Sequence, residues 1–208
     1  MNPVAAPTEN AMPAQRGAGR CAAWRGFTLI ELMVTLSVLA IVLSLAVPSF
    51  AELMAANRLS TQTNEFVGSL NLARSEAVRR GQPVTLRAVD NDNYSLGWQV
   101  FPDLNADGAA AGAANAADGL PIREVSRFSG NTAVKRVTRS DPPGPFTYTT
   151  ATDAARMHLV FTARGAINPV LPAFFKVCDA AKPSIKGRIV QVNVVGKISL
   201  DSVNESCS

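Results

Sequence analysis

The sequence is poor in the residues that bind metal ions. Of its 208 residues, one is histidine, His158, and three are cysteines, Cys21, Cys178 and Cys207. A zinc site gathers three or four histidine, cysteine or carboxylate ligands, and no third soft ligand accompanies the two C-terminal cysteines. No motif places a nucleophile or an acid beside His158 either. We therefore expect no metal, no cofactor and no enzymatic activity.

Charge is also scarce. Charged residues make up 17% of the chain and hydrophobic residues 47%, a balance that fits either a large apolar core or a small soluble domain joined to a membrane segment. The formal net charge is +4, an excess too mild to indicate a nucleic-acid partner by itself. The spacing of the apolar residues along the chain distinguishes these two classes of protein.

The chain opens with a basic leader, residues 1–26. This stretch is rich in Ala, Pro and Gly and shows no apolar period, so we expect no folded structure in it. It contains one acid, Glu9, and three arginines, Arg16, Arg20 and Arg25. Met12 is an alternative start that would shorten the leader.

An uninterrupted apolar run, residues 27–51, follows with one charged residue, Glu31. As a helix it would extend roughly 35 Å, enough to cross a bilayer. Basic residues precede it and none follows until Arg58, which predicts a cytoplasmic N-terminus and a periplasmic remainder. A secretory signal peptide is the alternative, but its cleavage site would follow the run, where Pro48 is badly placed.

The helical pattern continues beyond the apolar run, through residues 52–81. Gly81 and Pro83 then form a stop signal. We expect one helix over residues 28–80, with a transmembrane first half and an amphipathic second half that lies on a sheet. Its predicted apolar face consists of residues at helical spacing, Leu59, Phe66, Leu70, Ala73 and Ala77.

Residues 82–208 change to a period of two and predict a β-rich periplasmic head. The fold class is therefore α+β, a long helix packed on an antiparallel sheet or sandwich. Residues 103–119 and 141–153 are expected to be loops. Asp103, Asn105 and Asp107 alternate as in a calcium loop, but the later bidentate acid of such a loop is missing, so a tight, solvated hairpin turn is expected there. The expected strands are VTLRAV, GWQVF, PIREV, AVKRV, MHLVF, AFFKV, GRIVQVNVV and KISLDSV.

Two further expectations come from the residues themselves. A carboxylate within a membrane costs about 2.5–3.5 kcal/mol and needs a partner. If the chain is cut between Gly26 and Phe27, the new α-amino group of a neighbouring subunit could pair with Glu31. Removal of the leader also leaves an even pair of cysteines, for which an oxidising compartment favours a disulfide, Cys178–Cys207.

The segment from Gly26 to Glu31, GFTLIE, resembles the processing site of type IV prepilins and of type II secretion pseudopilins. The resemblance implies a prepilin peptidase that cuts after Gly26 and methylates the amino group of Phe27. It also implies assembly with other pilins or pseudopilins, in which Glu31 takes part. The subunit would first reside in the inner membrane, with its head in the periplasm, and then in a pilus or pseudopilus.

Later landmarks resemble the GspH/FimT family of minor pilins and pseudopilins: NLARSEAVRRG, GWQVF, the Phe161–Gly165 pattern and FKVC. FimT-like members imply DNA uptake through a Gly-Arg-x-Arg element, whose nearest match is residues 196–199, with Lys and Ser in place of the arginines. A GspH-like pseudopilin that supports protein export is the alternative, and a solvated strand face would explain the same cations. The candidate DNA-binding residues belong to a basic C-terminal stretch: Lys182, Lys186, Arg188 and Lys197.

Overall fold

The computed structural model describes residues 26–90, 93–108, 119–140, 147–150, 158–168, 171–182 and 184–202. The chain divides into two units between Ser44 and Leu45. The leader before Gly26 and the C-terminal residues 203–208 lie outside the described residues.

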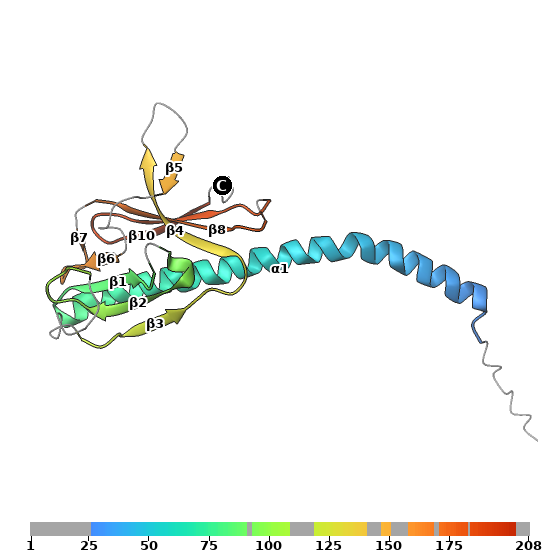
Figure 1. Cartoon of the computed structure of the whole chain (residues 1–208), viewed down its shortest axis with the longest axis horizontal. Coiled ribbons are helices and arrows are strands. Elements are labelled where there is room, and N and C mark those ends of the chain that lie inside the picture. Colours follow the sequence, from blue (N-terminus) through green and yellow to red (C-terminus); the bar gives the residue numbers. More distant parts are fainter. Residues whose placement is uncertain are drawn as a thin grey trace, which may run out of the picture. The chain divides into compact units, whose positions relative to one another are not determined.

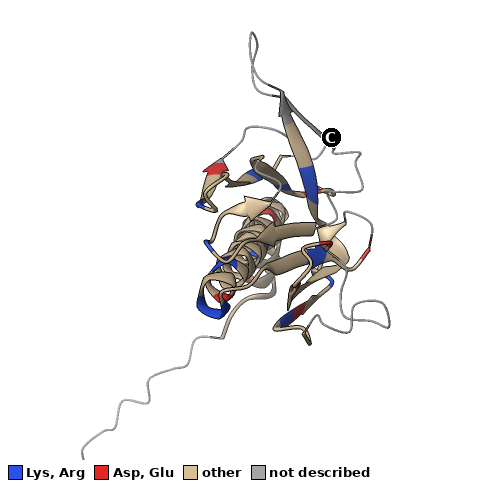
Figure 2. Ribbon diagram, turned by 90° about the vertical axis from the view of Figure 1, so that its left-hand side faces the viewer, with Lys and Arg blue, Asp and Glu red and all other residues tan. Residues whose placement is uncertain are grey.

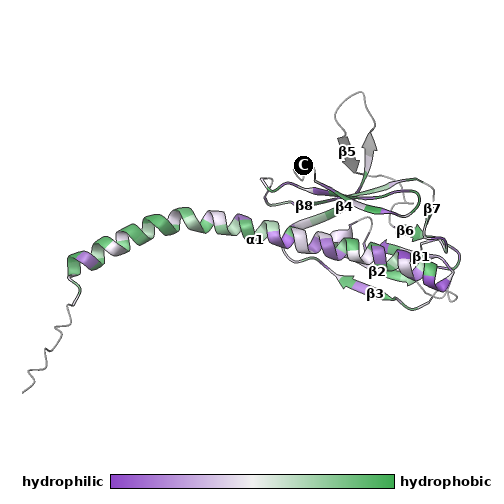
Figure 3. Ribbon diagram, turned by 180° about the vertical axis from the view of Figure 1, so that it is seen from behind, coloured by the Kyte–Doolittle hydropathy of each residue, from purple (hydrophilic) through white to green (hydrophobic). Residues whose placement is uncertain are grey.

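A single helix, α1 (Leu29–Arg80), continues through Pro48 and confirms the predicted helix. Apolar residues predominate in its first part, and polar residues become frequent in its second part (Figure 3). Gly81 ends the helix with a positive φ of 64°, a conformation that glycine adopts without strain. The amphipathic pattern is confirmed as well, because all five predicted face residues from Leu59 to Ala77 are buried.

The head consists of two five-stranded antiparallel sheets that lie along the same part of α1 (Figure 1). The first sheet has the order β3-β2-β1-β6-β7 and the second β10-β9-β8-β4-β5. The strands of the first are β1 (Val84–Ala88), β2 (Gly97–Pro102), β3 (Arg123–Ser126), β6 (His158–Phe161) and β7 (Ile167–Asn168). Those of the second are β4 (Thr132–Ser140), β5 (Thr147–Thr150), β8 (Ala173–Asp179), β9 (Arg188–Val192) and β10 (Ile198–Ser202).

All eight predicted strands are present, and the α+β fold class is confirmed. The expectation that residues 141–153 form only a loop was wrong, because β5 lies within them and pairs with β4. The Pro and Gly residues before β5 obscured its short alternating pattern. The two-residue β7 is too short for any periodicity to reveal it.

Phe66 of α1 stands at the centre of the core. Its ring meets three others edge to face, at centroid distances of 5.6 Å to Tyr94, 5.2 Å to Trp98 and 5.0 Å to Phe175. Trp98 belongs to the first sheet and Phe175 to the second, so one helix side chain joins both. Such aromatic contacts add about 0.5–1.5 kcal/mol each beyond burial. The core therefore fixes both sheets on the second half of α1.

Candidate functional site

The predicted cleavage and assembly residues stand at the start of α1. Phe27 is 82% exposed, and a side-chain atom placed on Gly26 would meet nothing within 4 Å. Thr28 caps the helix, since its Oγ1 accepts a hydrogen bond from the Glu31 backbone N–H at 3.2 Å. A threonine followed three residues later by glutamate is the capping-box pattern. This pattern is visible in the sequence, but the predictions above did not include a capping role for Thr28.

The apolar run is exposed along its whole length. No residue of α1 before Ala55 is buried, and the most apolar window of the helix has a mean hydropathy of 2.5 with none of it buried. By length and composition α1 could cross a membrane. A continuous apolar surface of this extent marks an interaction with lipid or with other proteins.

One end of the head, which we call the base, lies beside α1 where the helix enters it, at Glu52 to Arg58. There the guanidinium of Arg58 pairs with Asp179 at 3.2 Å, and this carboxylate is almost fully buried. Asp179 also accepts the Ala181 N–H at 2.9 Å. Ser184 Oγ donates to Glu52 Oε1 at 3.3 Å. The connection that follows β8 is therefore held against the helix at the base.

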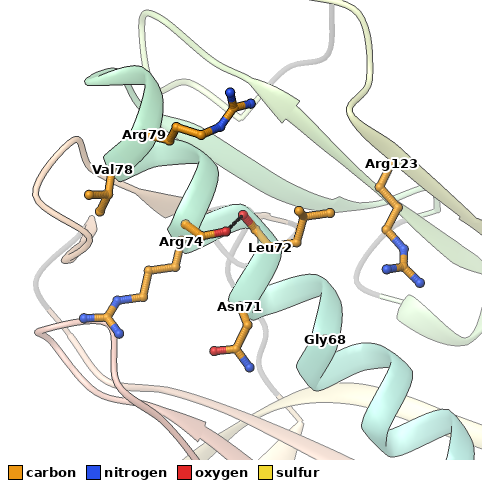
Figure 4. Close-up of a pocket in the computed structure, with 8 residues that line it drawn as sticks. Gly68, Asn71, Leu72, Arg74, Val78, Arg79 and Arg123 are labelled. Carbon is orange, nitrogen blue, oxygen red and sulfur yellow. Dashed lines mark hydrogen bonds between the residues drawn. The ribbon is translucent and has the colours of Figure 1, made fainter.

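The opposite end, which we call the far end, lies beside the last turns of α1. Arg74 donates from Nε to the Gly165 carbonyl at 3.1 Å and from Nη2 to the Val195 carbonyl at 3.3 Å, so it ties two turns to the helix. Figure 4 shows its side chain extending away from α1. A shallow groove of about 760 Å³ lies beside Arg74 and is also lined by Arg123 of β3. No sequence pattern indicated this role of Arg74, because its partners are distant in the chain.

The four candidate DNA-binding cations divide between the two ends. Lys182, Lys186 and Arg188 lie in or directly after the connection at the base, whereas Lys197 precedes β10 at the far end. The register of the β9–β10 hairpin enforces this separation, since Arg188 pairs with Ser202 at one end of the hairpin and Lys197 lies at the other. Arg58, at the base, and Arg74, at the far end, are about 24 Å apart along α1.

Further cations surround the far end. Figure 2 looks at the head from this end and shows Lys and Arg around the final turn of α1. Arg79 and Arg80 both pair with Glu76, which lowers the pKa of this carboxyl to about 2. Arg164 is exposed in the turn beside Gly165. The far end therefore carries more positive than negative charge.

The segment from Asp103 to Asp107 forms the predicted tight turn, but Asp103 is fully buried in it rather than solvated. The Asp103 carboxylate accepts hydrogen bonds from Thr85 Oγ1 at 2.6 Å and from the Gly108 N–H at 2.9 Å. These hydrogen bonds stabilise the loop. Gly108 packs on the ring of His158, whose pKa is lowered by burial. Among the described residues no three His, Cys, Asp or Glu side chains are grouped to hold a metal.

Cys178 is almost fully buried in β8. Its predicted partner, Cys207, lies outside the described residues, so the disulfide stays a prediction.

Family models match most of the described chain. A model described as the type II transport protein GspH matches residues 62–196. A second, described as the prokaryotic N-terminal methylation motif, matches residues 25–47. A curated relative, a fimbrial protein of Pseudomonas aeruginosa, is 29% identical over 87 residues, which are 41% of this chain. The match spans 56% of that relative, little more than half its length.

A solved structure shares the fold. The crystal structure of the type IV minor pilin FimU from Pseudomonas aeruginosa is 24% identical, with a TM-score of 0.54, and covers 73% of this chain and 96% of that one. A second crystal form of FimU gives a TM-score of 0.52 and covers 72% of this chain and 99% of that one. At this identity the likeness concerns the fold alone.

Proposed function

Because the chain belongs to the family of the type II transport protein GspH, we propose that it is a non-enzymatic minor subunit of a type IV pilus or a type II secretion filament. A prepilin peptidase cuts it after Gly26 and methylates Phe27. The helix then holds the subunit in the inner membrane, with the head in the periplasm, until it enters the filament.

One observation carries this proposal: the apolar part of α1 is exposed along its length, and most of it lies within the matched methylation motif. A core helix of a soluble protein would bury such a surface. Here the covering groups have to come from lipid first and from the helices of other subunits afterwards. Assembly exchanges one apolar environment for the other, so the helix never faces water.

Glu31 gives the assembly step its selectivity. In lipid its carboxylate has no partner, while in the filament the amino group of a neighbouring Phe27 can neutralise it. The cap formed by Thr28 offers a second explanation, in which Glu31 only supports the start of the helix. The two explanations differ in whether the negative charge itself is needed.

Two variants separate these explanations in filaments isolated from the native host. Glu31→Gln removes the charge but keeps a residue that suits a capping box, whereas Glu31→Ala removes both. We expect both variants to insert into the membrane and both to be poorly incorporated. Normal incorporation of Glu31→Gln beside poor incorporation of Glu31→Ala would assign Glu31 to capping, and normal incorporation of both would remove it from assembly.

DNA uptake is a second candidate function, favoured by the cations of the far end. Arg164 and Lys197 are exposed there, and clustered cations bind phosphates without sequence preference and with a steep salt dependence. Arg164→Glu with Lys197→Glu should abolish weak duplex binding and lower transformation. Unchanged transformation together with a defect in protein export would assign the subunit to a secretion filament, the alternative of the two systems.

A further inference from the structure

The connection between β8 and β9 at the base lies level with the end of the apolar run. We refer to its described residues, 180–182 and 184–187, as the base loop. Its Ser184 bonds to Glu52, the first charged residue after the run. Asp179, directly before the loop, bonds to Arg58 less than two helical turns further on. Two separate contacts thus hold the base loop beside the helix at this level.

The helix at this level has an exposed apolar surface. Within the same unit as the head, Leu45 is 73% exposed, Phe50 63% and Leu53 55%. Glu52 marks the change from residues suited to hydrocarbon to residues suited to water. If the run occupies the membrane, Glu52 stands at the layer of lipid headgroups, which is about 5–8 Å thick on each side.

The base loop presents lysines at this layer. Lys186 is exposed and Lys182 half-buried, while the neighbouring Ile185 packs against the core and fixes the loop. The Ile185 N–H donates to the Lys182 carbonyl at 3.0 Å and closes a turn. The nearby acids are engaged, Asp179 with Arg58 and Glu52 with Ser184. The loop therefore carries positive charge that these acids do not neutralise.

We propose that the base loop binds anionic phospholipid headgroups of the membrane that anchors the subunit, with Lys182 and Lys186 on the lipid phosphates. This contact rests on the membrane anchoring proposed above. Each lysine near an anionic surface strengthens the contact about fivefold, so the two together strengthen it about 25-fold. Long lysine stems suit this layer, since they lie on apolar surface while the ammonium groups reach the phosphates.

The test uses the mature full-length chain in nanodiscs of phosphatidylcholine alone or mixed with phosphatidylglycerol. Hydrogen exchange of the amides in residues 180–187 is the readout. We expect severalfold slower exchange in the anionic discs, reversed by high salt and lost in Lys182→Gln with Lys186→Gln. The matched control, Arg164→Gln with Lys197→Gln, removes the same charge at the far end and should keep the protection.

Equal exchange in the two kinds of disc, or protection that survives the double lysine variant, would overturn the lipid contact and leave the anchoring intact. Protection that duplex DNA produces and phosphatidylglycerol does not would overturn it in favour of a nucleic-acid site. A chain that inserts into neither disc would overturn the anchoring and this contact with it.

Discussion

Gly196 lies in a turn at the far end, directly against the carbonyl of Gly165. Its φ is 76°, and a Cβ placed on it would overlap the carbonyl oxygen of Gly165 and come within 3.0 Å of Arg74 Nε. Gly196→Ala therefore strains the backbone, at about 1–2 kcal/mol. It also displaces the carbonyl that Arg74 binds, and a hydrogen bond to a charged group contributes about 1.5–3 kcal/mol. The expected loss of stability is about 3–5 kcal/mol.

Gly81→Ala is the matched control, because Gly81 has a similar φ of 64° but nothing within 4 Å of an added Cβ. It should cost only the strain of the backbone, about 1–2 kcal/mol. Urea unfolding of the leaderless chain, followed by fluorescence, measures both, since the other tryptophan, Trp24, is in the leader and Trp98 is fully buried. If Gly196→Ala were no more destabilising than Gly81→Ala, the close approach of the two turns would be refuted.

Three further predictions concern the head. Burial lowers the pKa of His158 in the folded protein below its ordinary value of 6.5. The free energy of unfolding should therefore be highest above pH 6.5 and fall as the pH drops through the lower folded pKa. His158→Gln should make the free energy of unfolding depend less on pH in this range. Arg58→Met should cost about 2–3 kcal/mol in urea unfolding, because it leaves the buried Asp179 without its cation, and a loss no larger than that of Arg58→Lys would contradict this reason. The Cys178–Cys207 disulfide should contribute roughly 3–4 kcal/mol, and two reactive thiols in the non-reduced mature protein would disprove it.

Local patterns in the sequence predicted most of the fold. The spacing of Leu59, Phe66 and Leu70 gave the buried face of α1 correctly, because helical periodicity is a property of neighbouring residues. The alternating segments gave eight strands for the same reason. β5 was missed since only its pairing with β4 holds this short segment as a strand.

Contacts between distant residues were not predictable in this way. Arg58 meets Asp179 and Arg74 meets Val195 across separations of 121 residues in each case. The local sequence around neither arginine indicates which distant residue it contacts. The division of the basic residues has the same origin, because the β9–β10 register, which decides that Lys197 lies away from Arg188, is set by the pairing of strands.

The amino terminus of the assembled protein tests the central claim most directly. Mass spectrometry of subunits recovered from filaments should find a chain that begins at Phe27 and carries an N-methyl group on it, whereas Gly26→Glu should leave the full-length precursor in the membrane. The proposed function requires the cut to precede the apolar run, because this run would otherwise be lost as the surface for lipid and for neighbouring subunits. An intact leader on assembled subunits, or a terminus that follows residue 51, would contradict the account.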